Sequence, residues 1–150
     1  MGEKTLYIIK PEAFNERGRI RKIIQEKNNL SIDKYRIKKL TKKEVSLMID
    51  CDHGFKSNKK LFEAALYFMT RGLVEIGIIK GENCVNIFKE LCGNKKDPKR
   101  CEENTIRNIF GISEIMNYKG GGYYLNAIHR SDTIEEAEKE IQLFFKTEKT

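Results

Sequence analysis

One of the two histidines in the chain stands between a run of strand-forming residues and the start of a helix. His129 follows residues 123–128, which are rich in β-branched and aromatic side chains, and precedes a capping-box pair, Thr133 and Glu136. Free N–H groups at a helix N-terminus favour anions and oppose imidazolium, so we expect His129 to be neutral and nucleophilic near pH 7. The alternative is a structural histidine that caps the strand end.

Two basic residues lie at the ends of other short elements. Lys10 closes the apolar run 4–9, because the following Pro11 cannot continue a strand ladder, and Arg107 follows a long loop without periodicity. Taken singly, each is typical of a solvated surface residue. Around a neutral imidazole, however, a lysine and an arginine suit phosphoryl transfer, which needs alignment and positive charge on the phosphoryl oxygens.

Hydrophobic periodicity predicts the elements that must position these residues. Helical spacing is found in residues 19–27, 61–69 and 134–145 and in the segment after Gly81, whereas residues 4–9, 30–40, 73–79 and 123–128 favour strands. The alternation of the second strand slips between Ile32 and Tyr35, which indicates a bulge. Thr41 and Glu44 then form a capping box that predicts the start of a short helix. Residues 113–122 end in three glycines and predict a mobile hairpin or lid.

The order of the elements predicts the fold class. Without the short extra helices it reads β-α-β-α-β-α-β-α, which is typical of an α+β sandwich of the split βαβ type, with a four-stranded antiparallel sheet and helices on one face. We find no repeat or linker, so residues 1–150 are expected to form a single domain.

Composition narrows the class of function. A net charge of +7 suits polyanionic partners, either nucleic acid or phosphorylated small molecules, although a coding bias toward lysine, asparagine and isoleucine is an alternative cause. We find no apolar run of membrane-spanning length and no signal-peptide pattern, so we expect a cytoplasmic protein without a membrane partner. The four cysteines lack paired spacing, and the adjacent Cys51, Asp52 and His53 make weak ligands, so no protein-held metal is expected.

Three short motifs follow one another along the chain at the positions already singled out, and two further segments lie in and at the end of the predicted last helix. The motifs are Lys10-Pro11-Glu12, Thr105-Ile106-Arg107 and Asn126-x-Ile128-His129-x-Ser131-Asp132, and the segments are Ala137-Glu138-Lys139-Glu140-Ile141 and Phe144-Phe145-Lys146. As an ordered set they resemble the nucleoside diphosphate kinase family over nearly the whole chain. Each triplet taken alone is a weak signal.

This resemblance implies a ferredoxin-like fold and a ping-pong transfer of the terminal phosphate from a nucleoside triphosphate to a nucleoside diphosphate. His129 would be the nucleophile that becomes phosphohistidine, and Glu140, with Ser131 nearby, would hold its other ring nitrogen in the useful tautomer. The resemblance also implies Mg²⁺ carried with the nucleotide phosphates, and a homo-oligomer, either a hexamer or a tetramer.

The resemblance assigns the nucleotide contacts as well. Lys10 would lie beside the transferring phosphate, Arg107 would clamp phosphate oxygens, and Asn126 would bind the ribose and phosphate side of the nucleotide. Lys89 stands at the position of a phosphate-contacting arginine, where it keeps the charge and loses the bidentate fork. Leu61 falls on the position of a base-stacking phenylalanine, and His53 on that of a neighbouring tyrosine.

Several positions depart from the family pattern. The loop written Gly-x-Thr-Asn-Pro in the family is one residue longer here, over 93–98, and lacks the phosphate-binding threonine. Lys96 takes that place when counted back from Pro98, and Lys95 when counted on from Gly93. Glu12 replaces the usual aspartate, Arg130 replaces a small residue after His129, and residues 113–122 are an insertion. We expect these changes to leave the chemistry intact and to loosen the nucleotide grip.

Two other functions remain open from the sequence. One is a ferredoxin-like nucleic-acid-binding domain, which the basic surface and the strand tyrosines Tyr7, Tyr35, Tyr123 and Tyr124 would serve. Adjacent Tyr123 and Tyr124 face opposite sides of a strand, however, and the aromatic pattern of such domains is missing, so nucleic acid is not the expected partner. The other is a relative that binds nucleotide without turnover.

Overall fold

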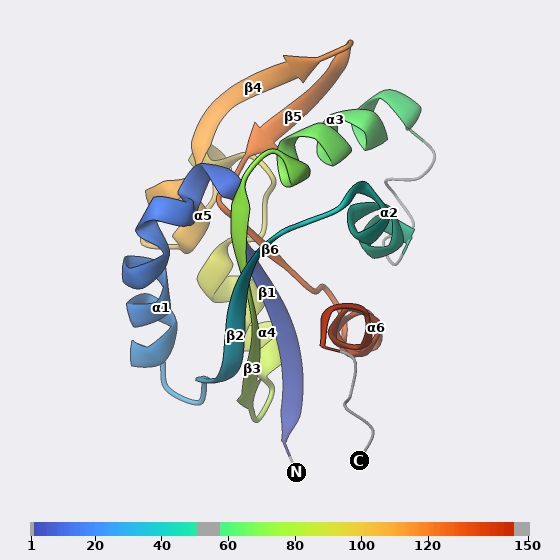
Figure 1. Ribbon diagram of the computed structural model, residues 1–150. Helices are drawn as coiled ribbons and strands as arrows, with labels where there is room; N and C mark the ends of the chain where they lie inside the picture. Colours follow the sequence, from blue (N-terminus) through green and yellow to red (C-terminus); the bar gives the residue numbers. More distant parts are fainter. Residues whose placement is uncertain (1, 51–57, 146–150) are drawn as a thin grey trace.

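Two apolar segments form the centre of a four-stranded sheet. In the computed structural model, which describes residues 2–50 and 58–145, β1 (Glu3–Ile9) pairs antiparallel with β3 (Leu73–Gly81). The edge strands β2 (Ser31–Lys39) and β6 (Ile128–Arg130) give the antiparallel order β2-β3-β1-β6 (Figure 1). This order is that of a split βαβ sandwich, so the predicted α+β ferredoxin-like class is confirmed.

Helices cover both faces of this sheet, and the expectation of helices on one face is wrong. Tyr7 and Ile9 point into an apolar cluster with α1 (Arg17–Glu26) and α4 (Cys84–Cys92). On the other face, Leu6 and Ile8 contribute to a cluster with three helices, which are α2 (Lys42–Asp50), α3 (Lys59–Thr70) and α6 (Ile134–Phe144). The reason is that consecutive β1 residues are apolar, so both faces of this strand must be buried.

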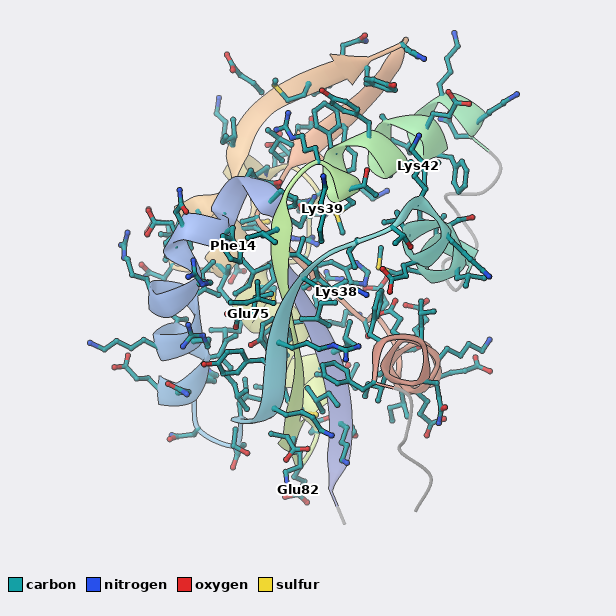
Figure 2. The ribbon with its side chains drawn as sticks, viewed as in Figure 1. Phe14, Lys38, Lys39, Lys42, Glu75 and Glu82 are labelled. Carbon is teal, nitrogen blue, oxygen red and sulfur yellow. The ribbon has the colours of Figure 1, made fainter. Side chains whose placement is uncertain are left out.

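The edge strand β2 carries the predicted irregularity. Its register against β3 shifts between Ile32 and Lys34, so the expected bulge is confirmed. Basic residues lie at the end of β2 and at the start of α2; Figure 2 labels Lys38, Lys39 and Lys42. The turn into α2 is fixed by a reciprocal capping box, in which Glu44 N donates to Thr41 Oγ1 and Thr41 N donates to Glu44 Oε1, as the sequence predicted.

The predicted last strand, 123–128, is in fact two strands in different sheets. β5 (Gly121–Leu125) pairs with β4 (Ile112–Tyr118) as a separate hairpin, and the chain then turns before β6. The hairpin packs on α3, because the Tyr67 and Tyr118 rings stack with centroids 4.2 Å apart and the Phe68 and Tyr123 rings at 5.1 Å. The insertion therefore forms the predicted hairpin and rests on a helix (Figure 1).

Short elements complete the chain between the strands. The 3₁₀ turn η1 (Pro11–Glu16) follows β1, and η2 (Pro98–Arg100) and α5 (Ile106–Phe110) fill the segment between α4 and the hairpin. Within the described part of the chain, none of the helices is long and apolar enough to cross a membrane.

Candidate active site

A cavity of about 410 Å³ lies beside β6 and has two chemically different walls. The residues of the first, here called the polar wall, are Lys10, Asn94, Lys96, Arg107, Asn126, His129 and Arg130. The residues of the second, here called the apolar wall, come from α2 and α3 and are Met48, Ile49, Leu61, Ala65 and Met69. A cavity with an apolar side and a few convergent polar groups is the usual form of a small-molecule site.

The fold gathers most of the residues that the sequence singled out. The lining of the cavity includes Lys10, Leu61, Lys96, Arg107, Asn126, His129 and Glu140. Ser131 is tied to the cavity through its hydrogen bond to Glu140, whereas Lys89 is not among the lining residues. His53 and Cys51 lie outside the described residues.

His129 is oriented by a carboxylate on α6. Its Nε2 lies 3.0 Å from Glu140 Oε1, and the Ser131 hydroxyl donates to the same oxygen at 2.8 Å. Because an ionised carboxylate only accepts hydrogen bonds, this arrangement places the ring proton on Nε2 and leaves the lone pair on Nδ1. Glu140 is almost fully buried, while about a quarter of the His129 side chain is exposed to the cavity and to solvent. The ring is thus held from behind and remains accessible.

A tight turn before β6 sets the direction of His129. Ala127 has φ +78°, and Ile128 N donates to Asn126 O at 2.9 Å across it. A non-glycine residue in this region carries strain of order 1–3 kcal/mol, so surrounding contacts must hold it. Glu12 Oε2 accepts from Ala127 N at 3.1 Å, and Lys10 N donates to Ala127 O at 2.9 Å. The longer Glu12 therefore supports the turn in this chain.

Lys10 is buried among polar partners at the end of β1. Its Nζ donates to Asn126 Oδ1 at 2.9 Å and to Tyr124 O at 3.3 Å, lies 3.7 Å from Glu12 Oε2, and sits 4.3 Å from the centre of the Tyr123 ring. The pKa of the Lys10 ammonium is lowered to about 8, mainly by burial; Glu12 opposes the shift, and nearby Arg107 adds to it. An anion in the cavity would favour the charged form.

Arg107 is held rigidly by backbone carbonyls. Its Nε and Nη2 donate to Ile128 O at 3.2 and 2.9 Å, and its Nη1 donates to Lys95 O at 3.0 Å. Burial first, and Arg130 second, lower the pKa of Arg107 to about 10. The helix that carries Arg107 begins at Thr105, whose hydroxyl accepts from Asn108 N, so the threonine before it serves as a helix cap.

The lengthened loop contributes Lys96 to the cavity lining, and Lys95 is not among the lining residues. Asn126 Nδ2 donates to Lys96 O at 3.0 Å, while Lys95 offers its carbonyl to Arg107. Of the two alignments that the sequence left open, this arrangement favours Lys96 facing the ligand space. Both residues are exposed.

Sequence reasoning missed Arg130 as a lining residue. The expectation noted only that it replaces a small residue, whereas the structure places Arg130 among the residues that line the cavity. The sequence carries no clear signal for this, because successive side chains of a strand point to opposite faces, so an arginine directly after His129 is expected to point away from it.

The tyrosines proposed for base stacking on nucleic acid are mostly unavailable. Tyr7 is fully buried, and its hydroxyl donates to buried Glu75 at 2.6 Å. Tyr123 is buried against Phe68, and Tyr35 is the one of these side chains with a large exposed fraction. The described strands therefore do not present a row of exposed aromatic rings.

Comparison with known proteins gives matches over nearly the entire chain. The sequence profile described as nucleoside diphosphate kinase matches residues 3–150. A nucleoside diphosphate kinase of Wolbachia pipientis wMel is 35% identical over 147 residues, covering 95% of this chain and 94% of the relative. One of Saccharolobus islandicus (strain L.S.2.15 / Lassen #1) is 32% identical over 145 residues, covering 95% and 94%. A crystal structure of the Aquifex aeolicus nucleoside diphosphate kinase superposes with a TM-score of 0.75 at 28% identity, covering 97% of this chain and 96% of that one.

Proposed function

The chain belongs to the nucleoside diphosphate kinase family and transfers the terminal phosphate of a nucleoside triphosphate to a nucleoside diphosphate, and we propose that His129 carries the phosphate between the two. The observation that carries this proposal is the pairing of His129 Nε2 with Glu140 at 3.0 Å. It leaves the Nδ1 lone pair free as the nucleophile, in a cavity whose lining includes the cations Lys10, Lys96, Arg107 and Arg130.

In the first half-reaction, the Nδ1 lone pair of His129 attacks the terminal phosphorus of the donor. The N–P bond forms while the P–O bond to the β-phosphate breaks, and its electron pair stays on the departing diphosphate. In the second half-reaction, a terminal oxygen of the acceptor diphosphate attacks the same phosphorus, the N–P bond breaks, and the lone pair returns to Nδ1. Glu140 keeps the proton on Nε2 throughout and stabilises the positive charge that the ring gains.

Positive groups of the polar wall stabilise the transferring phosphoryl group. Lys10 and Arg107 are fixed by hydrogen bonds before any ligand arrives, so little reorganisation is needed when charge develops on the phosphoryl oxygens. Asn126 connects these parts, because its side chain accepts from Lys10 and donates to Lys96 O. Lys96 and Asn126 contact the nucleotide phosphates and ribose, and Lys89 is a more distant source of charge.

Magnesium enters with the nucleotide. No group of three histidine, cysteine or carboxylate side chains suited to a metal occurs in residues 2–50 and 58–145. Of the carboxylates that line the cavity, Asp132 pairs with Arg130, Glu136 accepts from Asp132 N, and Glu140 is engaged by His129. The donor set therefore fits an ion held by phosphate oxygens and water, as Mg²⁺ often is. When bound, Mg²⁺ supplies charge neutralisation and a fixed shape for the phosphate chain.

The remaining properties follow the family expectation. The apolar wall around Leu61 takes the nucleobase by non-directional contact. The chain acts as a cytoplasmic homo-oligomer, a hexamer or a tetramer. Support for assembly is the edge position of β2, with Tyr35 and Ile37 nearly half exposed. Support for a reducing compartment is that Cys84, Cys92 and Cys101 are free thiols.

A labelling experiment tests the proposal. Incubation with Mg²⁺ and ATP or GTP labelled in the terminal phosphate is expected to give an acid-labile, base-stable phosphoprotein, and addition of unlabelled diphosphate removes the label. His129→Ala is expected to abolish labelling while keeping the wild-type circular dichroism spectrum. Wild-type protein that takes no label from either triphosphate would refute a phosphohistidine mechanism, and label that persists in the variant would place the phosphate elsewhere.

A further inference from the structure

Arg130 lies one residue after His129 and lines the same cavity. It pairs with Tyr7 across the β6–β1 ladder, as His129 pairs with Ile8, and its guanidinium reaches the C-terminal end of α4, where Nη2 donates to Gly93 O at 3.0 Å. Only 9% of the Arg130 side chain is exposed. This is an unusually buried place for a guanidinium, since arginine side chains are rarely buried unless they are paired.

The contacts of Arg130 neither neutralise its positive charge fully nor use all of its N–H donors. Its one carboxylate partner among the described residues is Asp132, which contacts Nη1 and whose side chain is nearly half exposed. Arg130 Nε is one of three buried side-chain polar atoms in the described chain without a hydrogen-bond partner. A buried cation with an incomplete set of acceptors lowers stability until an anion arrives.

Arg107 is a second guanidinium in the same wall. Burial lowers the pKa of Arg107 most, and the positive charge of Arg130 lowers it further, so the two cations repel one another. The Arg107 guanidinium donates its hydrogen bonds to the backbone carbonyls of Ile128 and Lys95 rather than to carboxylates. A ligand with several negative charges would relieve the repulsion between Arg107 and Arg130.

The end of α4 is also where the sequence led us to expect a cation from Lys89. Gly93 N donates to Lys89 O at 3.0 Å, so Lys89 lies one turn before the point where Arg130 docks. Lys89, however, is half-exposed and does not line the cavity. The basic group that the helix end presents to the ligand space comes instead from β6.

We propose that Arg130 is a nucleotide-binding residue, whose guanidinium acts with Arg107 to grip the oxygens of the di- or triphosphate chain. The proposal rests on the proposed function and adds a residue to that site. Arginine suits this place better than lysine, because its planar fork can hold Gly93 O and Asp132 while it presents further N–H groups to phosphate. A phosphate contact reads no base, so Arg130 serves all nucleotides alike.

Steady-state kinetics with Arg130→Gln and Arg130→Lys test the inference, with ADP and GDP as acceptors. Loss of a charge-assisted phosphate contact is expected to raise KM about ten-fold or more in Arg130→Gln, by the same factor for both nucleotides, and Arg130→Lys is expected to recover part of the loss. Arg100→Gln, which removes an exposed charge from η2, is the matched control and should keep wild-type KM.

Two further readouts separate phosphate binding from loop support. If Arg130 only pins the end of α4, Arg130→Gln will lower the melting temperature without ligand and leave KM within about two-fold of wild type in the folded protein, and the proposal is overturned. Guanidinium ion added to Arg130→Ala is expected to restore part of the lost turnover, and no restoration would count against it. Phosphohistidine labelling of wild type is a separate measurement. Wild-type protein that takes no label would refute the proposed function, whereas an unchanged KM in Arg130→Gln would refute only the role of Arg130.

Discussion

The polar wall and the apolar wall of the cavity are built on different physical principles. Lys10 and Arg107 are each fixed by at least two hydrogen bonds, and His129 is fixed by one to the buried Glu140. The partners of Lys10 come from the far end of the chain. The apolar wall offers methyl and methylene groups from α2 and α3, which make contacts without direction. Substitutions in the first wall should therefore change the reaction, and substitutions in the second should change nucleotide affinity slightly.

The largest effect in this comparison is expected for Lys10→Met, which replaces a buried ammonium with a side chain of similar length. It removes a preorganised positive charge that would lie beside the reacting phosphate, and it leaves Glu12 and Asn126 without the ammonium group that both contact. We expect kcat to fall roughly 10²- to 10³-fold. Lys99→Met, at an exposed position, is the control and should keep wild-type kcat. A loss below ten-fold for Lys10→Met would show that the polar wall is not preorganised around this residue.

An intermediate effect is expected from pH, through the same residue. Because burial lowers the pKa of Lys10 to about 8, its charge is lost above that pH, and kcat/KM should fall about ten-fold per pH unit beyond it. Stability should respond in the opposite direction. Between pH 8 and 10.5 the unfolded chain holds more protons at Lys10 than the folded chain, so the contribution of Lys10 to the free energy of unfolding rises with pH.

The free energy of unfolding of wild type, minus that of Lys10→Met, should therefore increase from pH 8 to 10.5. Chemical denaturation of both proteins across this range measures it, and subtraction removes the contributions of other groups. A kcat/KM profile that stays flat to pH 10, together with a constant stability difference, would contradict a depressed Lys10 pKa.

The smallest effect is expected in the apolar wall. Leu61 is half-buried at the start of α3, so Leu61→Ala removes only part of a side-chain contact and should raise KM about two- to five-fold with kcat unchanged. Larger purine nucleotides should lose more than pyrimidine nucleotides. Leu73→Ala, on an exposed β3 residue outside the cavity, is the matched control. If Leu61→Ala lowers kcat as strongly as Lys10→Met, the contrast between the two walls is wrong.

Local patterns in the sequence predicted most of the elements and the main candidates. The capping box at Thr41 and Glu44 and the bulge after Ile32 are found where expected, because they depend on residues that are neighbours along the chain. The ordered motifs around Lys10, Arg107 and His129 pointed to the family that the comparisons confirm.

Other features could not be read from neighbouring residues. Residues 123–128 look like one strand, yet the turn at Ala127 divides them, because Glu12 and Lys10 from the far end of the chain hold its N–H and C=O. Helices on both sheet faces, the inward place of Lys96 and the role of Arg130 likewise depend on which segments meet in space.

The sequence by itself determined most of the strand and helix types and the proposal of His129 as the nucleophile, since periodicity and short motifs act over a few residues. Only the tertiary structure decided the tautomer of His129, the burial that lowers the pKa of Lys10, and the pairing of Arg130 with Arg107 in one wall. These properties arise from desolvation and from neighbouring charges. Packing decides which segments meet, whether they are close in sequence, as His129 and Glu140 are, or more than a hundred residues apart, as Lys10 and Asn126 are.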